Sequence, residues 1–507
     1  MDVKLNLEDK EQKKRVLDIT KDLIIDEDNL YRLREVFENE LIHGLRGGLS
    51  ESSLQMENTY VPELTNGKER GSYLALDLGG TNFRVMLLEM ENGKIVKELV
   101  SYYTLDDSTR LGPGTDLFDA LAKCVMDFVT VHKLDETHGY LPLGFTFSFP
   151  MTQRGLGMIS RLRGWTGIFI AQFNMPSNLE IIEHIIILFL DVGILVNWTK
   201  SFNCDGVIGE DVVRMFNESI AKMNNLKVNV VAILNDTTGT LVKGSYDDPN
   251  CCIGLILGTG CNGAYLEKAE RVHNWDKKEN VNQVIIDSEF GAFGDNGCID
   301  FIKTEFDHMI DDQSLLPKSF TYEKYFAGKY IGELARLILL KLHQQDLLFH
   351  GKTVKLGEKG IFTSSDLSEI ENDAFNATKV FDSLSLNGSY AKTYDIFSKL
   401  GMSNEDDIHK SDLRIFQYVC KVLSERCGLL VGVPLAVFLD RIDKEGECAI
   451  AVTGSLYKYH PRLKMVLEKY IAKALKKSSI RFYTFLSDDG SGKGAGLVAA
   501  IAERVKQ

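Results

Sequence analysis

The chain is organised around Ile233-Leu234-Asn235-Asp236-Thr237-Thr238-Gly239-Thr240. An apolar run from Val228 to Leu234 leads into it and predicts a buried strand. A carboxylate at the end of such a strand is held rigidly at the mouth of a cleft. Taken alone, Asn235 and Asp236 leave two interpretations open. They form a helix N-cap, which Asn and Asp favour, or they carry a catalytic base.

Length and composition limit the possible classes of protein. A chain of 507 residues predicts two or more domains, and 44% hydrophobic with 26% charged residues is ordinary for a soluble globular protein. The formal net charge of −14 argues against nucleic acid or an anionic membrane as a partner. The nine cysteines show no paired CxxC metal spacing, and residues 1–25 lack an apolar signal core. We therefore expect reduced thiols and a cytoplasmic location.

A glycine-rich hairpin is predicted between residues 73 and 89. Two apolar runs flank the tip, and the functional positions in and around it are Asp77, Gly79, Gly80, Thr81, Asn82 and Arg84. Glycines let backbone N–H groups approach a phosphate closely, and Thr81, Asn82 and Arg84 supply further donors. Asp77 would repel phosphate directly, so we expect it to act through water on a magnesium ion. The alternative is an Asn/Gly turn with a solvated arginine.

A second hairpin of the same kind is predicted between residues 252 and 267. Its tip reads Gly258-Thr259-Gly260-Cys261-Asn262-Gly263 and echoes the first tip. Two related phosphate hairpins suggest two similar lobes that face each other across a cleft. The glycines also match the dinucleotide pattern Gly-x-Gly-x-x-Gly, which is weak evidence because a helix need not follow Gly263.

Other polar side chains stand at the ends of apolar runs or among glycines. Each has a structural alternative: a strand end for Ser148, solvated side chains for Thr199 and Lys200, a helix-start residue for Glu323, and flexible turns for Gly454, Ser455 and 490–496. Glu289 lies among glycines and aromatics, which suits a buried carboxylate that accepts from a sugar hydroxyl. Leu30, Leu33, Phe37 and Leu41 recur at helical spacing and predict an amphipathic helix that packs on the rest of the chain. Residues 49–70 read as an irregular connector, and residues 487–496 as a Gly-rich loop before a helix.

The motifs together resemble the hexokinase family. They occur in the family's order from about Val61 to about Val498 and read LDLGGTNFR (76–84), GFTFSFP (144–150), NWTKSF (197–202), LNDTTGTL (234–241), LGTGCN (257–262), SEFGAFGD (288–295), YEK (322–324), TGSLYKYHP (453–461) and GSGKGAG (490–496). The resemblance implies a two-lobed α/β fold of the actin-like, ribonuclease-H-like ATPase kind, with a cleft between a small and a large domain. It implies one catalytic unit, and we expect a monomer.

The resemblance also implies domain boundaries. Residues 1–70 would form an N-terminal helix and connector on the large lobe, and 71–234 the small lobe. Residues 235–485 would form the large lobe, and 486–507 a Gly-rich loop and helix that return to the small lobe.

By the same resemblance the chain transfers the γ-phosphate of ATP, with Mg²⁺, to the 6-hydroxyl of glucose and related hexoses. Asp236 would be the general base, and Lys200 would stabilise charge on the transferred group. The sugar-binding positions implied are Ser148, Thr199, Lys200, Asn235, Asp236, Asn262, Glu289 and Glu323. The ATP-binding positions implied are Asp77, Gly79, Gly80, Thr81, Asn82, Arg84, Thr259, Gly454 and Ser455.

Two other functions stay open at this point. A non-catalytic sugar-binding or sensing protein would keep the sugar residues without turnover. An oxidoreductase would use the Gly258–Gly263 pattern for a dinucleotide.

One segment departs from the family pattern. Gly157–Leu190 separates Leu156 from Asp191, which the family holds close together, and residues 181–190 carry eight large apolar side chains. This segment is too short and, with Glu183 and His184, too polar for a membrane span. Exposed, it would form a patch liable to aggregate. Buried at the cleft, it could impair activity.

Deleting residues 157–190 joins Leu156 to Asp191 and restores the family spacing. Loop entropy alone tolerates long insertions, since each doubling costs only about 0.6 kcal/mol, so the apolar composition decides the outcome. We expect the deletion variant to be more soluble and at least as active in glucose phosphorylation as the full chain. Loss of activity on deletion would show that the segment is a functional part.

Overall fold

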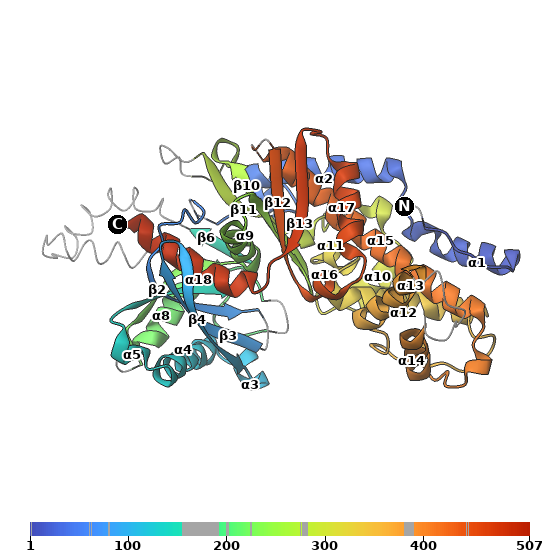
Figure 1. Cartoon of the computed structure of the whole chain (residues 1–507), viewed down its shortest axis with the longest axis horizontal. Coiled ribbons are helices and arrows are strands. Elements are labelled where there is room, and N and C mark those ends of the chain that lie inside the picture. Colours follow the sequence, from blue (N-terminus) through green and yellow to red (C-terminus); the bar gives the residue numbers. More distant parts are fainter. Residues whose placement is uncertain are drawn as a thin grey trace, which may run out of the picture.

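Two mixed sheets, each with its own helices, make up the computed structural model (Figure 1). It describes all residues except 2, 60, 62, 80–81, 155–191, 199–201, 224–225, 274, 276–281, 380–389, 443, 445 and 507. The segment 157–190 therefore lies outside the described residues. We call the five-stranded sheet with its helices the small lobe, and the six-stranded sheet with its helices the large lobe.

The small-lobe sheet has the strand order β4-β3-β2-β5-β8. Strands β4, β3 and β2 pair antiparallel, whereas β2, β5 and β8 run parallel. The strands are β2 (Gly71–Leu78), β3 (Asn82–Glu91), β4 (Lys94–Thr104), β5 (Leu141–Phe147) and β8 (Val228–Leu234). β6 (Met151–Arg154) and β7 (Val192–Leu195) pair antiparallel and form a separate two-stranded sheet. The predicted strand over 228–234 and the predicted first hairpin are confirmed.

The large-lobe sheet repeats the same arrangement. Its order is β1-β11-β10-β9-β12-β13, with β11, β10 and β9 antiparallel and β9, β12 and β13 parallel. The strands are β1 (Glu57–Asn58), β9 (Cys251–Leu257), β10 (Cys261–Lys268), β11 (Gln283–Asp287), β12 (Gly446–Thr453) and β13 (Ile480–Leu486). Each sheet thus has a hairpin whose first strand pairs with a parallel strand. The duplicated two-lobed α/β fold expected from the sequence is confirmed.

Two helices lie between the sheets, α9 (Asp236–Asp247) and α18 (Gly490–Lys506). Figure 1 shows α18 leaving the end of β13 and running back over β2. An apolar layer of small side chains from both sheets and both helices surrounds them, including Ala75, Ala232, Ala451 and Ala495. These short side chains allow the four layers to approach closely.

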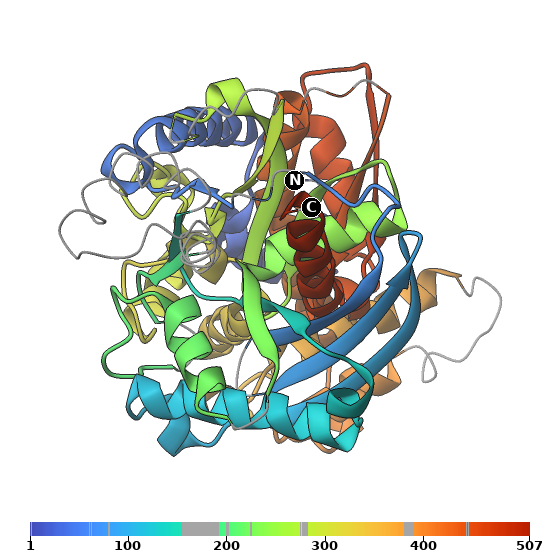
Figure 2. The same cartoon turned by 90° about the vertical axis from the view of Figure 1, so that its left-hand side faces the viewer.

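The remaining helices cover the outer faces. The small lobe carries α3 (Asp107–Arg110), α4 (Gly114–Val131), α5 (Leu134–Thr137) and α8 (Val212–Ala221). The large lobe and the N-terminal segment carry α1 (Lys10–Thr20), α2 (Glu27–Gly47), α10 (Glu305–Asp312), α11 (Thr321–Lys324), α12 (Gly328–Gln344), α13 (Ser364–Lys379), α14 (Ala391–Lys399), α15 (Lys410–Arg441), α16 (Ser455–Tyr459) and α17 (Leu463–Ala474). Figure 2, turned by 90°, shows the blue N-terminal helices beside the large-lobe elements.

The helix expected from Leu30, Leu33, Phe37 and Leu41 is α2, and all four side chains are buried in the large-lobe core. Phe37 meets Phe293 edge-on, with ring centroids 5.0 Å apart. Helix α15 is long and apolar enough to cross a membrane, but its most apolar window is wholly buried inside the large lobe.

Two sequence interpretations were wrong in detail. The connector 49–70 contains β1, which pairs antiparallel with the end of β11. The glycines at 490–496 do not form a loop, because α18 begins at Gly490. Their helical conformation is explained by packing: a Cβ on Gly494 would lie 2.1 Å from the carbonyl oxygen of Gly239 in α9. Tertiary contact overrides the low helix propensity of glycine here.

Gly494→Ala tests this contact between α18 and α9. In an exposed helix the change from glycine to alanine is stabilising by about 1 kcal/mol. At 494 the added methyl must displace backbone, so we expect a loss of about 1–3 kcal/mol or more in the free energy of unfolding. Gly139→Ala is the control, because a Cβ there meets nothing within 4 Å. Urea unfolding of both variants measures the difference, and equal stabilities would contradict the packing argument.

Candidate active site

Three polar side chains from three elements converge where the sheets face each other. Asn235 precedes α9, Asn262 lies in β10, and Glu289 follows β11. Both amides donate to one carboxylate oxygen: Asn235 Nδ2 lies 3.0 Å and Asn262 Nδ2 3.1 Å from Glu289 Oε1. The structure therefore brings together three residues that the sequence predicted separately.

The backbone around Glu289 holds its carboxylate in place. Glu289 has a left-handed φ of +51°, and its side chain is 7% exposed. The preceding residue, Ser288, donates both its N–H (3.0 Å) and its hydroxyl (2.6 Å) to the carbonyl oxygen of Gly263. A non-glycine residue in this conformation costs about 1 kcal/mol or more, so the surrounding bonds must enforce it.

Asp287, to which the sequence analysis gave no role, belongs to the same cluster. Its Oδ1 accepts from Asn262 Nδ2 at 2.8 Å and from Thr237 Oγ1 at 3.2 Å. Burial raises the pKa of Asp287 to about 6, and the negative charge of Asp236 acts in the same direction. The signal in the sequence was a second carboxylate at the strand end, two residues before Glu289.

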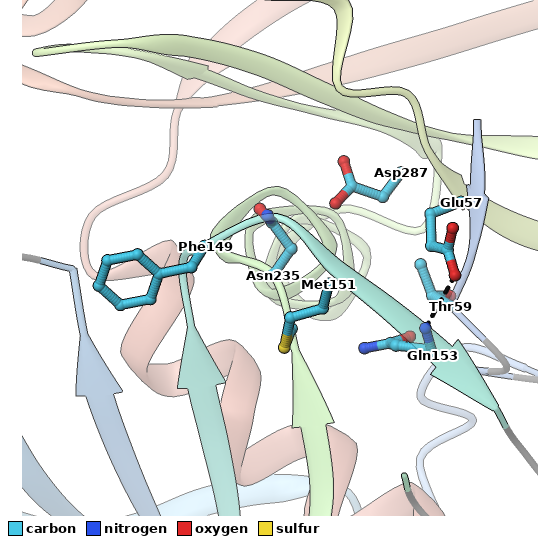
Figure 3. A pocket seen from close by; sticks show the side chains of 7 residues that line it. All are labelled: Glu57, Thr59, Phe149, Met151, Gln153, Asn235 and Asp287. Carbon is cyan, nitrogen blue, oxygen red and sulfur yellow. Dashed lines mark hydrogen bonds between the residues drawn. The ribbon is translucent and has the colours of Figure 1, made fainter. Parts of the chain in front are cut away.

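A small cavity of about 10 Å³ adjoins this cluster, room for about one water-sized molecule (Figure 3). Figure 3 shows the Asp287 carboxyl group turned toward Asn235. Glu57, in β1, lines the far side and accepts from the backbone N–H of Gln153 at 2.8 Å. Burial raises the pKa of Glu57 to about 7. No pattern in the sequence indicated Glu57, because a two-residue strand gives no periodic signal.

Ser148 follows β5 and is 4% exposed. Its hydroxyl makes no hydrogen bond with any residue that the structure describes. A buried polar group without a partner is costly, which suits a position that a ligand hydroxyl completes.

An aromatic cluster fixes the chain on either side of the predicted lysine turn. Phe149 meets Trp198 edge-on with centroids 4.9 Å apart, and Trp198 stacks on Phe202 at 5.7 Å. Trp198 Nε1 donates to the carbonyl oxygen of Cys204. Thr199 and Lys200 lie outside the described residues, but their flanking residues are anchored next to Ser148.

Glu323, in α11, lies at the tip of the β9–β10 hairpin. Its Oε2 accepts from the backbone N–H of Cys261 at 3.1 Å, next to Asn262. A Cβ on Gly260 would lie 2.7 Å from the same oxygen and would push the carboxylate away from its present position. The bond holds a second carboxylate beside the cluster.

The first hairpin is tied to the N-terminus of α18 by ion pairs. Asp77 and Arg84 are opposite each other in the β2–β3 register, and Asp77 Oδ2 accepts from Arg84 Nη2 at 2.9 Å and Ser491 Oγ at 2.8 Å. Arg84 also pairs with Asp489. Burial raises the pKa of Asp77 although Arg84 acts against it. The charge of Arg84 is thus shared between two carboxylates.

Gly79, the described glycine of the first hairpin tip, has free space on the side where a Cβ would lie. A Cβ on Gly79 would meet nothing within 4 Å, and Asn82 begins β3. Gly80 and Thr81 lie outside the described residues.

The second hairpin packs against the end of β12. Gly454 has a φ of +140°, and a Cβ there would lie 2.2 Å from the carbonyl oxygen of Leu257. Thr259 accepts from the backbone N–H of Lys329 at 3.1 Å, and Ser455 begins α16. The predicted phosphate and adenosine positions of the large lobe are therefore adjacent. Because β10, and not a helix, follows the tip, the dinucleotide interpretation of Gly258–Gly263 is wrong.

Comparisons with known proteins point to one family. Two family models, both described as hexokinase, match residues 15–172 with 188–246 and residues 252–501. A hexokinase of Brugia malayi is 34% identical over 486 residues, which cover 95% of this chain and 76% of that protein. Hexokinase-2 of Homo sapiens is 35% identical over 494 residues, 96% of this chain and 48% of that protein. The chain spans about half the length of such vertebrate relatives.

A solved structure, a hexokinase from Schistosoma mansoni complexed with glucose, is similar at a TM-score of 0.79 and 32% identity. The matched region covers 97% of this chain and 100% of the Schistosoma mansoni chain. The break in the first family match, between residues 172 and 188, falls inside the atypical segment 157–190.

Glu57→Gln tests the protonation of the cavity carboxyl. The raised pKa means that the folded chain holds the proton that the unfolded chain has lost between about pH 4.5 and 7. The stabilising contribution of Glu57 is therefore full below pH 4.5 and is lost as pH rises through about 7. Gln keeps an acceptor and cannot ionise. Between pH 5 and pH 8 we expect the free energy of unfolding of the variant to rise by about 1–2 kcal/mol relative to that of wild type.

Urea unfolding at both pH values measures this difference. Glu136→Gln, at an exposed position of α5, is the control and should show no such gain. If Glu57→Gln differs from wild type in the free energy of unfolding by the same amount at pH 5 and pH 8, the Glu57 carboxyl ionises normally.

Proposed function

This chain belongs to the hexokinase family, and we propose that it transfers the γ-phosphate of ATP to the 6-hydroxyl of glucose and related hexoses. The observation that carries the proposal is the bonded cluster of Asn235, Asn262 and Glu289 beside Asp236. It is a set of neutral donors and carboxylate acceptors, which suits a polyol, set between two glycine-tipped hairpins, which suit phosphates.

The sugar would complete the hydrogen bonds of this cluster. Glu289 and Glu323 accept from sugar hydroxyls, and charge-assisted bonds of this kind are worth about 1.5–3 kcal/mol each. Asn235 and Asn262 keep the Glu289 carboxylate oriented, and each offers a polar edge to the ligand. The unpaired hydroxyl of Ser148 gains a partner. Thr199 and Lys200 join this set by their place in the family motif.

Asp236 is assigned the role of general base. It is the first residue of α9, directly after the strand that ends at Leu234. Besides burial, the negative charge of Asp236 acts to raise the pKa of Asp77 in the first hairpin and of Asp287 beside Glu289, which supports a position near both groups. A carboxylate at that point can take the proton of the 6-hydroxyl as the hydroxyl attacks phosphorus. Phosphoryl transfer otherwise depends on positioning and on charge stabilisation.

The ATP phosphates would lie between the two hairpin tips. On the small lobe the positions are Gly79, Gly80, Thr81, Asn82 and Arg84, next to the N-terminus of α18, where backbone N–H groups favour an anion. On the large lobe Thr259 faces the phosphates, and Gly454 with Ser455 faces the adenosine. The close packing of Gly454 on Leu257 keeps these two large-lobe elements together.

Magnesium would be held at this site through water on Asp77, as the sequence suggested. Within the described residues no group of three His, Cys, Asp or Glu side chains could hold a metal ion. Arg84 Nε, Arg84 Nη2 and Ser491 Oγ all donate to Asp77 Oδ2, and Asp77 would hold the ion through a water molecule. A bound ion would neutralise negative charge on the phosphates. We also propose a cytoplasmic, monomeric enzyme, for which the expected reduced thiols and net negative charge are the support.

An assay of ADP release from ATP in the presence of glucose tests the function. Purified protein should release ADP only when a hexose is present, and several hexoses tested in parallel define the preference. Absence of hexose-dependent release would favour a sugar-binding protein without turnover.

Asp236→Asn removes the base but keeps the shape and hydrogen bonding of the side chain. We expect turnover to fall by at least about 100-fold, the lower range for a general base, with glucose binding largely kept. Asp247→Asn, at the other end of the same helix, is the matched control and should turn over normally. Near-normal turnover of Asp236→Asn would remove this residue from the base role.

A further inference from the structure

One hydrogen-bond donor joins two carboxyl groups behind the sugar cluster. Asn262 Nδ2 lies 2.8 Å from Asp287 Oδ1 and 3.1 Å from Glu289 Oε1. Because both oxygens accept from one nitrogen, the two buried carboxyl groups lie close together. At such a separation two carboxyl groups can hydrogen-bond to each other when one of them carries a proton.

The surroundings of the pair favour keeping that proton. Asp287 and Glu289 are both buried. The titratable groups around Asp287 are Glu57, opposite it in the β1–β11 register, Asp236 at the start of α9, and Glu289 itself. Asp77 lies beyond Asp236. All are acidic, and like charges in a buried site disfavour full ionisation. Lys200, the cation of the family motif, lies outside the described residues.

We propose that Asp287 and Glu289 form a proton-sharing carboxyl pair, and that a bound sugar displaces the shared proton. The inference rests on the proposed function, because Glu289 must be a sugar acceptor. Asp287 is then a positioning residue: it orients the Asn262 amide and the Thr237 hydroxyl, and it sets the pH range in which the sugar binds.

The displacement follows from competition for the same lone pairs. Sugar hydroxyls donate to carboxylate oxygens, and donated hydrogen bonds favour the charged form. The shared proton occupies an oxygen that a hydroxyl would otherwise use. Sugar binding therefore lowers the proton affinity of the pair, and the proton leaves to the buffer. By linkage, sugar affinity must fall as pH falls below about 6, the pKa of Asp287.

Asp287→Asn separates this effect from simple packing. The amide has the same shape, its oxygen can accept from Asn262 and Thr237, and its nitrogen donates permanently to Glu289. It replaces the shared proton with a hydrogen that cannot dissociate. The variant should bind the sugar at pH 7.5 with the weaker affinity that wild type shows near pH 5.5, and this affinity should not change between the two pH values.

Calorimetric titration of the whole chain with glucose at pH 5.5, 6.5 and 7.5, in two buffers of different ionisation enthalpy, measures the protons released. For wild type we expect release that approaches one proton per site at pH 5.5, and up to about a tenfold loss of affinity per pH unit below 6. Asp287→Asn should release no proton. Asp211→Asn is the matched control, because burial also raises the pKa of Asp211, which caps α8 in the small lobe.

Two results would overturn the proposal. One is unchanged proton release in Asp287→Asn. The other is loss of the release in Glu57→Gln, which would assign the proton to Glu57.

A second measurement keeps the pair testable apart from the proposed function. In the sugar-free protein, carbon-13 NMR of aspartate carboxyl groups should show a resonance that titrates near pH 6 and is missing in Asp287→Asn. If glucose does not bind, the proposed function fails, and this resonance alone decides whether the pair exists. Absence of the resonance in wild type overturns the pair whatever the protein binds.

Discussion

The structure depends on one backbone contact, the approach of α18 to α9 at Gly494 and Gly239. No side chain fits between them, and Gly144 in β5 meets Ala495 of the same helix as closely. The N-terminus of α9 carries Asn235 and Asp236, whereas the N-terminus of α18 binds the first hairpin through Ser491. The helix contact thus fixes the distance between the proposed base and the proposed phosphate site. Separate surface loops could not hold them so rigidly.

The cleft is divided by charge in a way that matches two different ligands. On one side, Glu57, Asp287 and Glu289 accept hydrogen bonds from neutral amides and hydroxyls. Such donors complete the hydrogen bonds of the carboxyl groups without adding a positive charge, which suits an uncharged polyol. A phosphate would be repelled there. On the other side, glycine-tipped hairpins and a helix N-terminus supply backbone N–H groups, which favour anions. Asp236 follows the strand that ends at Leu234, and in the proposed function it lies where the sugar oxygen attacks phosphorus.

The sequence predicted the elements whose signal is local. Apolar runs around glycine tips predicted both hairpins, and the spacing of Leu30, Leu33, Phe37 and Leu41 predicted α2. The sequence also pointed to Asn235, Asn262 and Glu289, because each stands where an apolar run meets polar or glycine residues. What it missed depends on long-range pairing. Glu57 enters the site through a two-residue strand paired with β11, and such a short strand has no period. The glycines of 490–496 are helical only because α9 lies against them.

Asn235 confirms the first of the two interpretations that the opening stretch left open, the helix N-cap, while the catalytic base stays a prediction. Its Oδ1 accepts from the backbone N–H of Thr237 at 3.1 Å, so it is the N-cap of α9. Its Nδ2 donates to Glu289 at the same time. Aspartate could cap the helix equally well, but it has no hydrogen to give to a carboxylate and would add a like charge to the cluster. The cap fixes the side-chain rotamer, and the rotamer aims the amide at Glu289. The stability of the helix start and the geometry of the proposed sugar site therefore rest on the two ends of one amide group.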